Sequence, residues 1–142
     1  MKTLDIKLKQ TGDLMKIEHL AMLVKDPLAV AKWYTDVLGL RVVRQGPGPN
    51  HMHFLSDDGN HVMIEIYTNE TVPVPDYWSM DPLVLHLALV CTSMQADHAK
   101  LVAAGCTPVG DISTTAAGDK LAMLRDPWGF AIQLADRKQP MI

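Results

Sequence analysis

The sequence contains the stretch Ile17-Glu18-His19-Leu20-Ala21-Met22, and a matching stretch, Val84-Leu85-His86-Leu87-Ala88-Leu89, follows 67 residues later. In each stretch one histidine stands in a short apolar run that is typical of a β-strand, and we expect these strands over Met15–Val24 and Leu83–Cys91. The segments that follow the two histidines also match in their order. A self-similarity with a fixed period indicates two copies of one structural unit.

Each copy continues with a helix and three further strands. Asp26 and Ser93 are possible helix N-caps seven residues after their histidines, and Gly39 and Gly105 are placed to end the two helices. Apolar runs separated by turn residues then predict three strands in each copy. The sequence therefore predicts an α+β fold made of two tandem βαβββ modules.

The repeat also predicts where the modules lie along the chain. We expect one domain over residues 15–142, with the first module at about 15–70 and the second at about 83–137. Prolines between the modules exclude a central strand there, so residues 71–82 are expected to be a linker. Residues 1–14 have no counterpart in the second half and are expected to form an N-terminal extension.

Composition narrows the class of protein. A length of 142 residues, 48% hydrophobic and 20% charged, is ordinary for one globular domain, and the two cysteines are too few for a disulfide scaffold. The net charge of −3 gives no reason to expect nucleic acid or an anionic membrane as a partner. No signal peptide or run long enough to span a bilayer is recognised, so we expect a cytoplasmic protein.

Four polar side chains occupy equivalent places in the two copies. Glu65 stands 46 residues after His19, and Gln133 stands 47 residues after His86. Because carboxylates are seldom buried without a partner, these positions predict a divalent metal site, with a metal-free hydrogen-bonded cluster as the alternative. Two imidazoles, one carboxylate and one amide suit Zn²⁺, Ni²⁺, Co²⁺, Mn²⁺ or Fe²⁺.

These features resemble the vicinal oxygen chelate superfamily, which includes glyoxalase I, methylmalonyl-CoA epimerase, bleomycin-resistance proteins and extradiol dioxygenases. The resemblance covers nearly all of residues 15–137. It rests on the two histidine strands, the stretch 33–40, the Glu65 strand, and Asp126-Pro127-Trp128-Gly129 running into Gln133. It implies a curved, partly open mixed sheet around one metal ion, with helices on the outer face, and a homodimer.

The resemblance also implies roles for individual residues. The implied metal ligands are His19, Glu65, His86 and Gln133. Glyoxalase I uses a glutamate as catalytic base at the last of these positions, and an amide cannot take a proton there, so Glu65 is expected to be the catalytic proton shuttle. Asn69 matches an asparagine that contacts glutathione, whereas Leu23 replaces an arginine that holds a glutathione carboxylate.

Further side chains are candidates for binding the substrate. His51 and His53 share one face of their expected strand, and they point toward the pocket if Met52 and Phe54 point away from it. Tyr67 shares the face of Glu65. The candidate substrate-binding residues are therefore His51, His53, Tyr67 and Asn69.

Together these observations predict an enzyme of the glyoxalase type, a metal-dependent lyase or isomerase. It would act through an enediolate on a small substrate with adjacent oxygens. Two alternatives stay open. His19, His86 and Glu65 would also suit an Fe(II) extradiol-type dioxygenase. The resemblance to bleomycin-resistance proteins allows a binding protein without catalysis.

Overall fold

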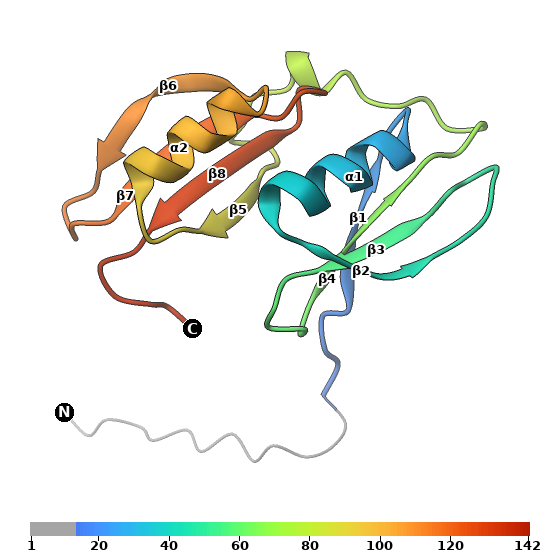
Figure 1. The fold of residues 1–142 in the computed structure, drawn as a ribbon, viewed down its shortest axis with the longest axis horizontal. Coiled ribbons are helices and arrows are strands. Elements are labelled where there is room, and N and C mark those ends of the chain that lie inside the picture. The colour runs from blue at the N-terminus through green and yellow to red at the C-terminus, as the bar shows by residue number, and fades with distance from the viewer. Residues whose placement is uncertain (1–13) are drawn as a thin grey trace, which may run out of the picture. The chain divides into compact units, whose positions relative to one another are not determined.

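The computed structural model describes residues 14–142, so residues 1–13 of the expected N-terminal extension lie outside the described part. The described residues divide into two compact units, 14–71 and 72–142. Each unit contains one βαβββ module, as the repeat predicts (Figure 1).

The first unit is a four-stranded sheet with one helix. Its elements in chain order are β1 (His19–Leu23), α1 (Pro27–Leu38), β2 (Arg41–Gln45), β3 (His53–Ser56) and β4 (Met63–Tyr67). The strand order is β1-β4-β3-β2, with β1 and β4 parallel and the other pairs antiparallel. Helix α1 contacts β2, β3 and β4.

The second unit repeats this topology after one short extra turn. Its elements in chain order are η1 (Tyr77–Ser79), β5 (Leu87–Val90), α2 (Met94–Ala103), β6 (Thr107–Thr114), β7 (Lys120–Arg125) and β8 (Ala131–Asp136). The strand order is β5-β8-β7-β6, again with one parallel pair, β5 and β8. Helix α2 contacts β7 and β8.

The helix ends follow the sequence signals in one module and depart from them in the other. Asp26 caps α1, because its side chain accepts a hydrogen bond from the Ala29 backbone, and Gly39 ends the helix with a φ of +75°. Ser93 is the N-cap residue of α2 but makes no capping bond with its side chain. Asp136 of β8 instead accepts the backbone N–H of Met94.

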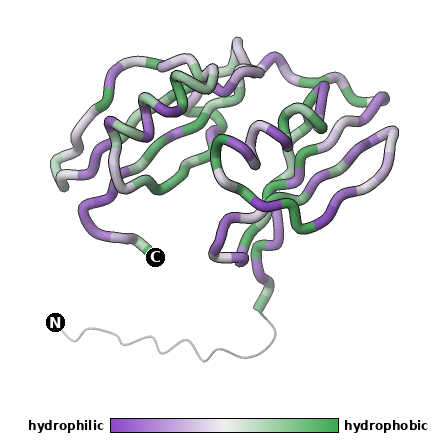
Figure 2. The backbone as a smooth tube through the Cα atoms, viewed as in Figure 1, coloured by the Kyte–Doolittle hydropathy of each residue, from purple (hydrophilic) through white to green (hydrophobic). Residues whose placement is uncertain are grey.

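Each unit has its own apolar core between the helix and the sheet. In the first unit Val30 and Tyr34 of α1 are fully buried against Leu55 and Ile66 of the sheet. In the second unit the fully buried large side chains are Met94, Leu124, Ile132 and Asp126. Both helices alternate between hydrophobic and hydrophilic residues along their length (Figure 2), as helices that cover a sheet do.

Several strands are shorter than the sequence predicts, and one correction affects a candidate ligand. The strand expected from Leu83 begins only at Leu87, because Asp81 accepts hydrogen bonds from the backbones of Leu83 and Val84 and holds them in a turn. His86 therefore precedes β5 rather than lying within it. The first strand begins at His19 itself, not at residue 15.

The expected linker is ordered where it follows the unit boundary. Arg125 of β7 donates hydrogen bonds to the carbonyl oxygens of Tyr77, Met80 and Gly129, at 2.8, 2.7 and 3.1 Å. The Tyr77 ring also meets Phe130 edge-on at 5.1 Å. This arginine therefore fixes η1 to the second sheet, a role that its sequence position did not indicate.

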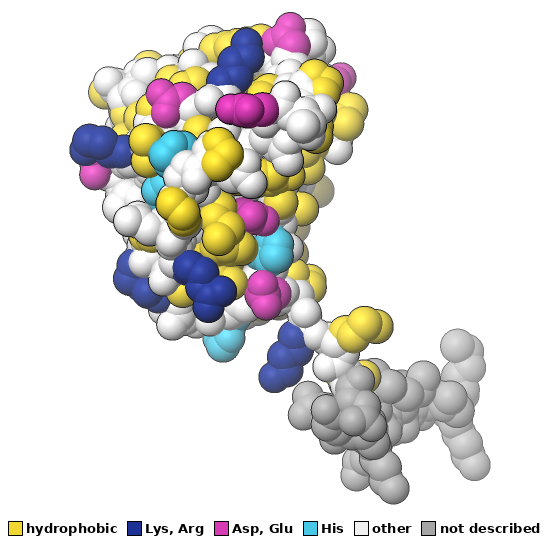
Figure 3. Space-filling model, turned by 90° about the vertical axis from the view of Figure 1, so that its right-hand side faces the viewer, with side chains coloured by type: hydrophobic (Ala, Val, Ile, Leu, Met, Phe, Trp, Pro, Cys, Tyr) yellow, Lys and Arg dark blue, Asp and Glu magenta, His cyan; other side chains and the backbone are white. Residues whose placement is uncertain are grey.

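No helix within residues 14–142 is long and apolar enough to cross a membrane. Hydrophobic side chains are nevertheless exposed in both units, among them Leu20, Val43, Trp78 and Val90. Figure 3 shows hydrophobic side chains among charged side chains and histidines on the face that it displays.

Candidate functional site

The first unit brings two of the four candidate ligands together. His19 pairs with Met63, and Ala21 pairs with Glu65, in the parallel register of β1 and β4. Paired residues point to the same face of a sheet, and residues two apart on a strand share that face. His19 and Glu65 therefore share a face, as predicted, and His19 Nε2 lies 3.3 Å from Glu65 Oε2.

The other nitrogen of His19 is held from outside the sheet. Its Nδ1 lies 2.9 Å from Oε1 of Glu18, and the ring packs edge-on against Phe54 at 5.2 Å. The Glu65 side chain is 17% exposed, whereas that of Glu18 is 72% exposed. The imidazole thus lies between two carboxylates, one within the site and one at its rim.

The contact with Glu18 determines which nitrogen of His19 carries a hydrogen, and therefore what the His19–Glu65 pair needs between its facing atoms. An ionised Glu18 only accepts hydrogen bonds, so Nδ1 of His19 carries the hydrogen and a neutral ring presents a lone pair at Nε2. A lone pair and the Glu65 carboxylate would then face each other. Two acceptors at this distance need a shared proton or a shared cation between or beside them.

The second unit fixes His86 in the same tautomer by different means. Nδ1 of His86 lies 2.8 Å from the carbonyl oxygen of Pro82, which can only accept, so Nδ1 is the donor. Its neutral ring also presents Nε2 as a lone pair. Metal-binding histidines commonly use one nitrogen for the metal and the other for such an acceptor. The donor set therefore fits a divalent cation.

Gln133 lies on β8 opposite Ala88 of β5 and Met123 of β7, and it is half-buried. Its small neighbour Ala88 is exposed. Two candidate ligands, His19 and Glu65, thus belong to the first unit, and the other two, His86 and Gln133, belong to the second. Within residues 14–142 there is no cluster of three or more His, Cys, Asp or Glu side chains that could hold a metal ion.

The register of β3 reverses the expected orientation of its histidine. His53 pairs with Ile66, and Phe54 pairs with Glu65, so Phe54 is on the candidate site's face and His53 is on the opposite one. His53 is 7% exposed and lines a cavity with Ala31 and Thr35 of α1. The expectation that His53 points toward the pocket is therefore wrong.

The remaining candidate residues lie near the ends of strands. His51 precedes β3 in a loop with a φ of +45°, and its carbonyl oxygen is 2.7 Å from Nδ1 of His53. Tyr67 pairs with Leu23 at the end of β4 and is half-buried. The Asn69 side chain accepts hydrogen bonds from the backbone and hydroxyl of Thr71, so it also shapes the turn that closes the first unit.

The two thiols are poor nucleophiles at neutral pH. Burial raises the pKa of Cys106 to about 12, and burial together with the nearby Asp97 and Asp136 carboxylates also raises the pKa of Cys91. Cys106 is buried, whereas Cys91 is half-buried. Covalent catalysis through a thiolate therefore finds no support in either unit.

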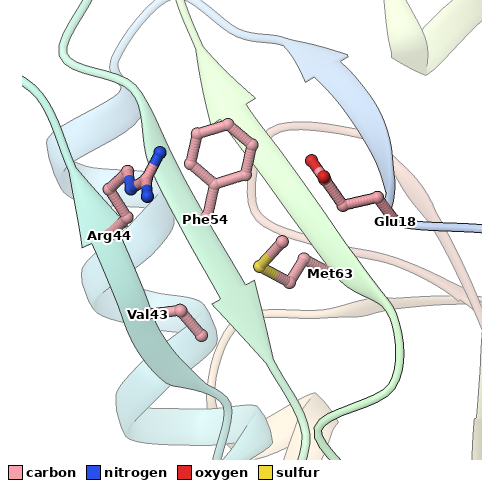
Figure 4. A pocket seen from close by; sticks show the side chains of 5 residues that line it. All are labelled: Glu18, Val43, Arg44, Phe54 and Met63. Carbon is pink, nitrogen blue, oxygen red and sulfur yellow. The ribbon is translucent and has the colours of Figure 1, made fainter.

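The first unit also contains a pocket that sequence reasoning missed. It has a volume of about 130 Å³ and is lined by Glu18, Val43, Arg44, Phe54 and Met63 (Figure 4). Arg44 pairs with Phe54, so both lie on the face that carries Glu65. A bulge between Val42 and Arg44 shifts the register, and strand alternation alone could not have assigned Arg44 to this face.

The second unit contains a larger and more apolar pocket, with a volume of about 520 Å³. Its wall includes residues 88–92 of β5 and the segment after it, Ala135 of β8, and the side chains of Met141 and Ile142. Ala88 belongs to this wall and also neighbours Gln133 across the sheet. The pocket therefore begins beside a candidate ligand.

Comparisons with known proteins agree with this architecture. The model of the Glyoxalase/Bleomycin resistance protein/Dioxygenase superfamily matches residues 16–134. A comparison with curated proteins finds no significant match.

Solved structures with the same fold differ widely in sequence. A glyoxalase family protein from Bacillus cereus has a TM-score of 0.72 at 18% identity, covering 87% of this chain and 94% of its own. TnmS3, an antibiotic binding protein from Streptomyces sp. CB03234, has a TM-score of 0.68 at 22% identity, covering 89% of this chain and 98% of its own. A superfamily member from Sphaerobacter thermophilus has a TM-score of 0.70 at 15% identity, covering 87% and 98%.

Proposed function

This chain belongs to the Glyoxalase/Bleomycin resistance protein/Dioxygenase superfamily, and we propose that it is a metal-dependent lyase or isomerase of the glyoxalase type. Its substrate would be a small molecule with adjacent oxygens, such as a hydroxy-ketone or a hemithioacetal. The observation that carries the proposal is the His19–Glu65 pair, whose facing acceptor atoms at 3.3 Å call for a proton or a cation.

The residues proposed to hold one divalent cation are His19, Glu65, His86 and Gln133. Both histidines are supported in this role by the acceptors on their Nδ1 atoms, which leave Nε2 as the donor atom. When bound, such a cation supplies the Lewis acidity that polarises a substrate carbonyl. The set holds one carboxylate, so a divalent ion there keeps a net positive charge.

Glu65 is the side chain proposed to move the proton. It would take a proton from the substrate carbon that bears the hydroxyl, which forms an enediolate, and return it to the neighbouring carbonyl carbon, while the hydroxyl proton passes to the former carbonyl oxygen. Gln133 cannot replace it, because an amide does not accept a proton at neutral pH. Glu65 is mostly shielded from water, which suits a group that must return the same proton.

Replacing Glu65 tests this assignment directly. We expect Glu65→Gln to lower turnover of a phenylglyoxal–thiol hemithioacetal by about 1,000-fold, the loss typical of removing a general base. Glu70→Gln is the matched control, because Glu70 is exposed and follows β4 in the same unit. Turnover would be followed by absorbance, and folding by circular dichroism. A folded Glu65→Gln variant with the turnover of the control would end the proposal.

Binding without catalysis is a second candidate, favoured by the apolar pocket of about 520 Å³ in the second unit. TnmS3, a protein of the same fold, is an antibiotic binding protein. For this function we would expect an apolar, aromatic antibiotic to raise the melting temperature with no change to the ligand. Substitution of Glu65 would leave that stabilisation unchanged.

Oxygen chemistry is the remaining alternative for the same ligand set. Two histidines and one carboxylate also suit Fe²⁺ in oxygenases. Oxygen uptake with catechol, measured after loading with Fe²⁺ and compared with Ni²⁺ and Zn²⁺, separates this activity from isomerisation. We further propose that the chain acts as a homodimer, which light scattering after size-exclusion chromatography would test.

A further inference from the structure

The pocket lined by Glu18, Val43, Arg44, Phe54 and Met63, the rim pocket hereafter, lies on the same face of the first sheet as the His19–Glu65 pair. One cross-strand row contains Arg44 of β2, Phe54 of β3 and Glu65 of β4. Neighbouring strands are about 4.8 Å apart, so the Cα atoms of Arg44 and Glu65 are about 10 Å from each other. A substrate that reacts at Glu65 therefore has Arg44 within reach of its far end.

The two charged walls of the rim pocket have opposite signs. Figure 4 shows the Arg44 guanidinium on one side of the Phe54 ring and the Glu18 carboxylate on the other, with Met63 below them. Arg44 is exposed, and among residues 14–142 no carboxylate forms an ion pair with it. Glu18 uses Oε1 for His19, which leaves its second oxygen as an acceptor.

Between these walls the lining is apolar. The Phe54 ring and the Met63 thioether form its floor, and Val43 extends it along β2. An aromatic ring and a methionine side chain suit an apolar body of irregular shape. The whole lining therefore complements a molecule with an anionic end, an apolar middle and an end that donates a hydrogen bond.

We infer that Arg44 is a specificity-determining residue that binds the carboxylate of an anionic substrate, while Glu18 accepts a hydrogen bond from the hydroxyl at its reacting end. The inference rests on the proposed function, since it names the substrate class for the His19–Glu65 site. A guanidinium binds a carboxylate through two parallel hydrogen bonds, which orients the ligand as well as attracting it. The substrate class is thus a hydroxy-ketone or related compound with a carboxylate at the opposite end of an apolar body.

Binding of a probe to the metal-free protein tests the inference without any need for turnover. The probe is 4-(hydroxymethyl)benzoate, and its neutral counterpart is 4-(hydroxymethyl)benzamide. Two-dimensional ¹H–¹⁵N NMR would follow the backbone amides of residues 43, 44, 54 and 63 during titration. We expect the benzoate to shift these signals and to bind about fivefold more tightly than the amide, the factor expected from one exposed ion pair.

Two arginine variants separate a specific contact from a general effect of charge. Arg44→Leu is expected to abolish the preference for the benzoate. Arg41→Leu is the control, because it removes the same charge from the same strand. The Arg41 guanidinium is hydrogen-bonded to Asn60 in the turn between β3 and β4, so this variant is expected to keep the preference for the benzoate over the amide. Equal binding of the benzoate and the amide to the native protein, or an equal loss in both variants, would overturn the role of Arg44.

The hydroxyl contact is tested with a third probe, 4-methylbenzoate. We expect the native protein to bind 4-(hydroxymethyl)benzoate more tightly than 4-methylbenzoate, and Glu18→Ala to remove that difference. The Glu18→Ala variant keeps Arg44, so it should still bind the benzoate more tightly than the benzamide. An unchanged difference in Glu18→Ala would overturn the role of Glu18. If the carboxylate preference holds but Glu65→Gln keeps its turnover, the proposed reaction fails while the anion site stands.

Discussion

Each candidate histidine gives its Nδ1 hydrogen to a fixed acceptor, and this contact decides which nitrogen a ligand meets. For His19 the acceptor is the Glu18 carboxylate, and for His86 it is the Pro82 carbonyl oxygen. The two contacts arise from different local structures, a side chain beside a strand and a turn before one. The shared outcome, a lone pair on Nε2, is therefore the property that a metal site in both modules would require.

The tautomer of His86 is a prediction at this scale. In the metal-free protein with a neutral imidazole, we expect hydrogen on Nδ1 and none on Nε2, because a carbonyl oxygen cannot donate. Long-range ¹H–¹⁵N correlation spectra distinguish the two nitrogens. The exposed His61 provides an internal reference in the same spectrum. A protonated Nε2 on neutral His86 would remove the argument for a preset metal ligand.

Short connecting elements, rather than the sheets alone, hold the second unit together. Arg125 of β7 donates hydrogen bonds to two backbone carbonyls around η1 and to that of Gly129, and Asp119 binds the segment that follows β8. Asp119 accepts a hydrogen bond from the Lys138 backbone at 2.9 Å and one from Arg137 at 3.2 Å. The contacts of Arg125 with Tyr77 and Met80 (the Arg125 clamp), and those of Asp119 with residues 137 and 138, join residues that are distant in sequence. They therefore tie separate elements of the second unit together.

The Arg125 clamp predicts a loss of stability when it is removed. We expect Arg125→Met to lower the free energy of unfolding by about 2 kcal/mol, since charge-assisted bonds are lost and half-buried carbonyls lose their donor. Urea denaturation measures the change. Arg41→Met, which removes an exposed arginine from the other unit, is the control and is expected to cost under about 0.5 kcal/mol. Equal effects of the two substitutions would contradict a structural role for the Arg125 contacts.

Asp119 predicts how stability varies with pH. The Lys138 N–H and the Arg137 side chain lower the pKa of Asp119 in the folded protein. The stability that the ionised carboxylate contributes is therefore fully present above its unfolded-state pKa, and it is lost as the pH falls through the folded-state pKa. Asp119→Asn keeps an acceptor but removes the charge. We therefore expect it to lower stability at pH 7 and to have less effect as the solution becomes strongly acidic. Parallel stability profiles of the two proteins across this range would contradict the assignment.

At the scale of the whole molecule, the four proposed metal ligands come from both halves of the chain. His19 and Glu65 belong to residues 14–71, whereas His86 and Gln133 belong to residues 72–142. A ligand that binds only the folded state stabilises that state by mass action. Binding of the proposed cation would therefore raise the melting temperature of the protein.

Metal content and thermal stability test the proposed cation binding. We expect about one divalent ion per chain by elemental analysis, and a rise in melting temperature on adding it, with both lost in His19→Ala and in His86→Ala. Gln133→Glu is expected to bind the ion more tightly, because a carboxylate replaces a neutral donor. Gln139→Glu adds the same charge at an exposed position as a control. Unchanged metal content in His86→Ala would exclude the shared site.

The sequence alone determined the features that depend on local pattern and repetition. Alternating apolar residues and cap signals predict the βαβββ order of both modules and the start and end of α1. The repeat also predicts that Glu65 and Gln133 occupy equivalent positions, and each is the third residue of its strand, β4 or β8.

Tertiary structure decided whatever depends on strand register or on contacts distant in sequence. A bulge in β2 places Arg44 beside Phe54, and the β3–β4 register turns His53 toward α1, which no alternation rule could specify. The Asp81 turn moves His86 out of its strand, and Arg125 acquires partners more than 40 residues away. The alternation of side chains between the two faces of one strand is local, whereas the register between two strands is a property of the folded sheet.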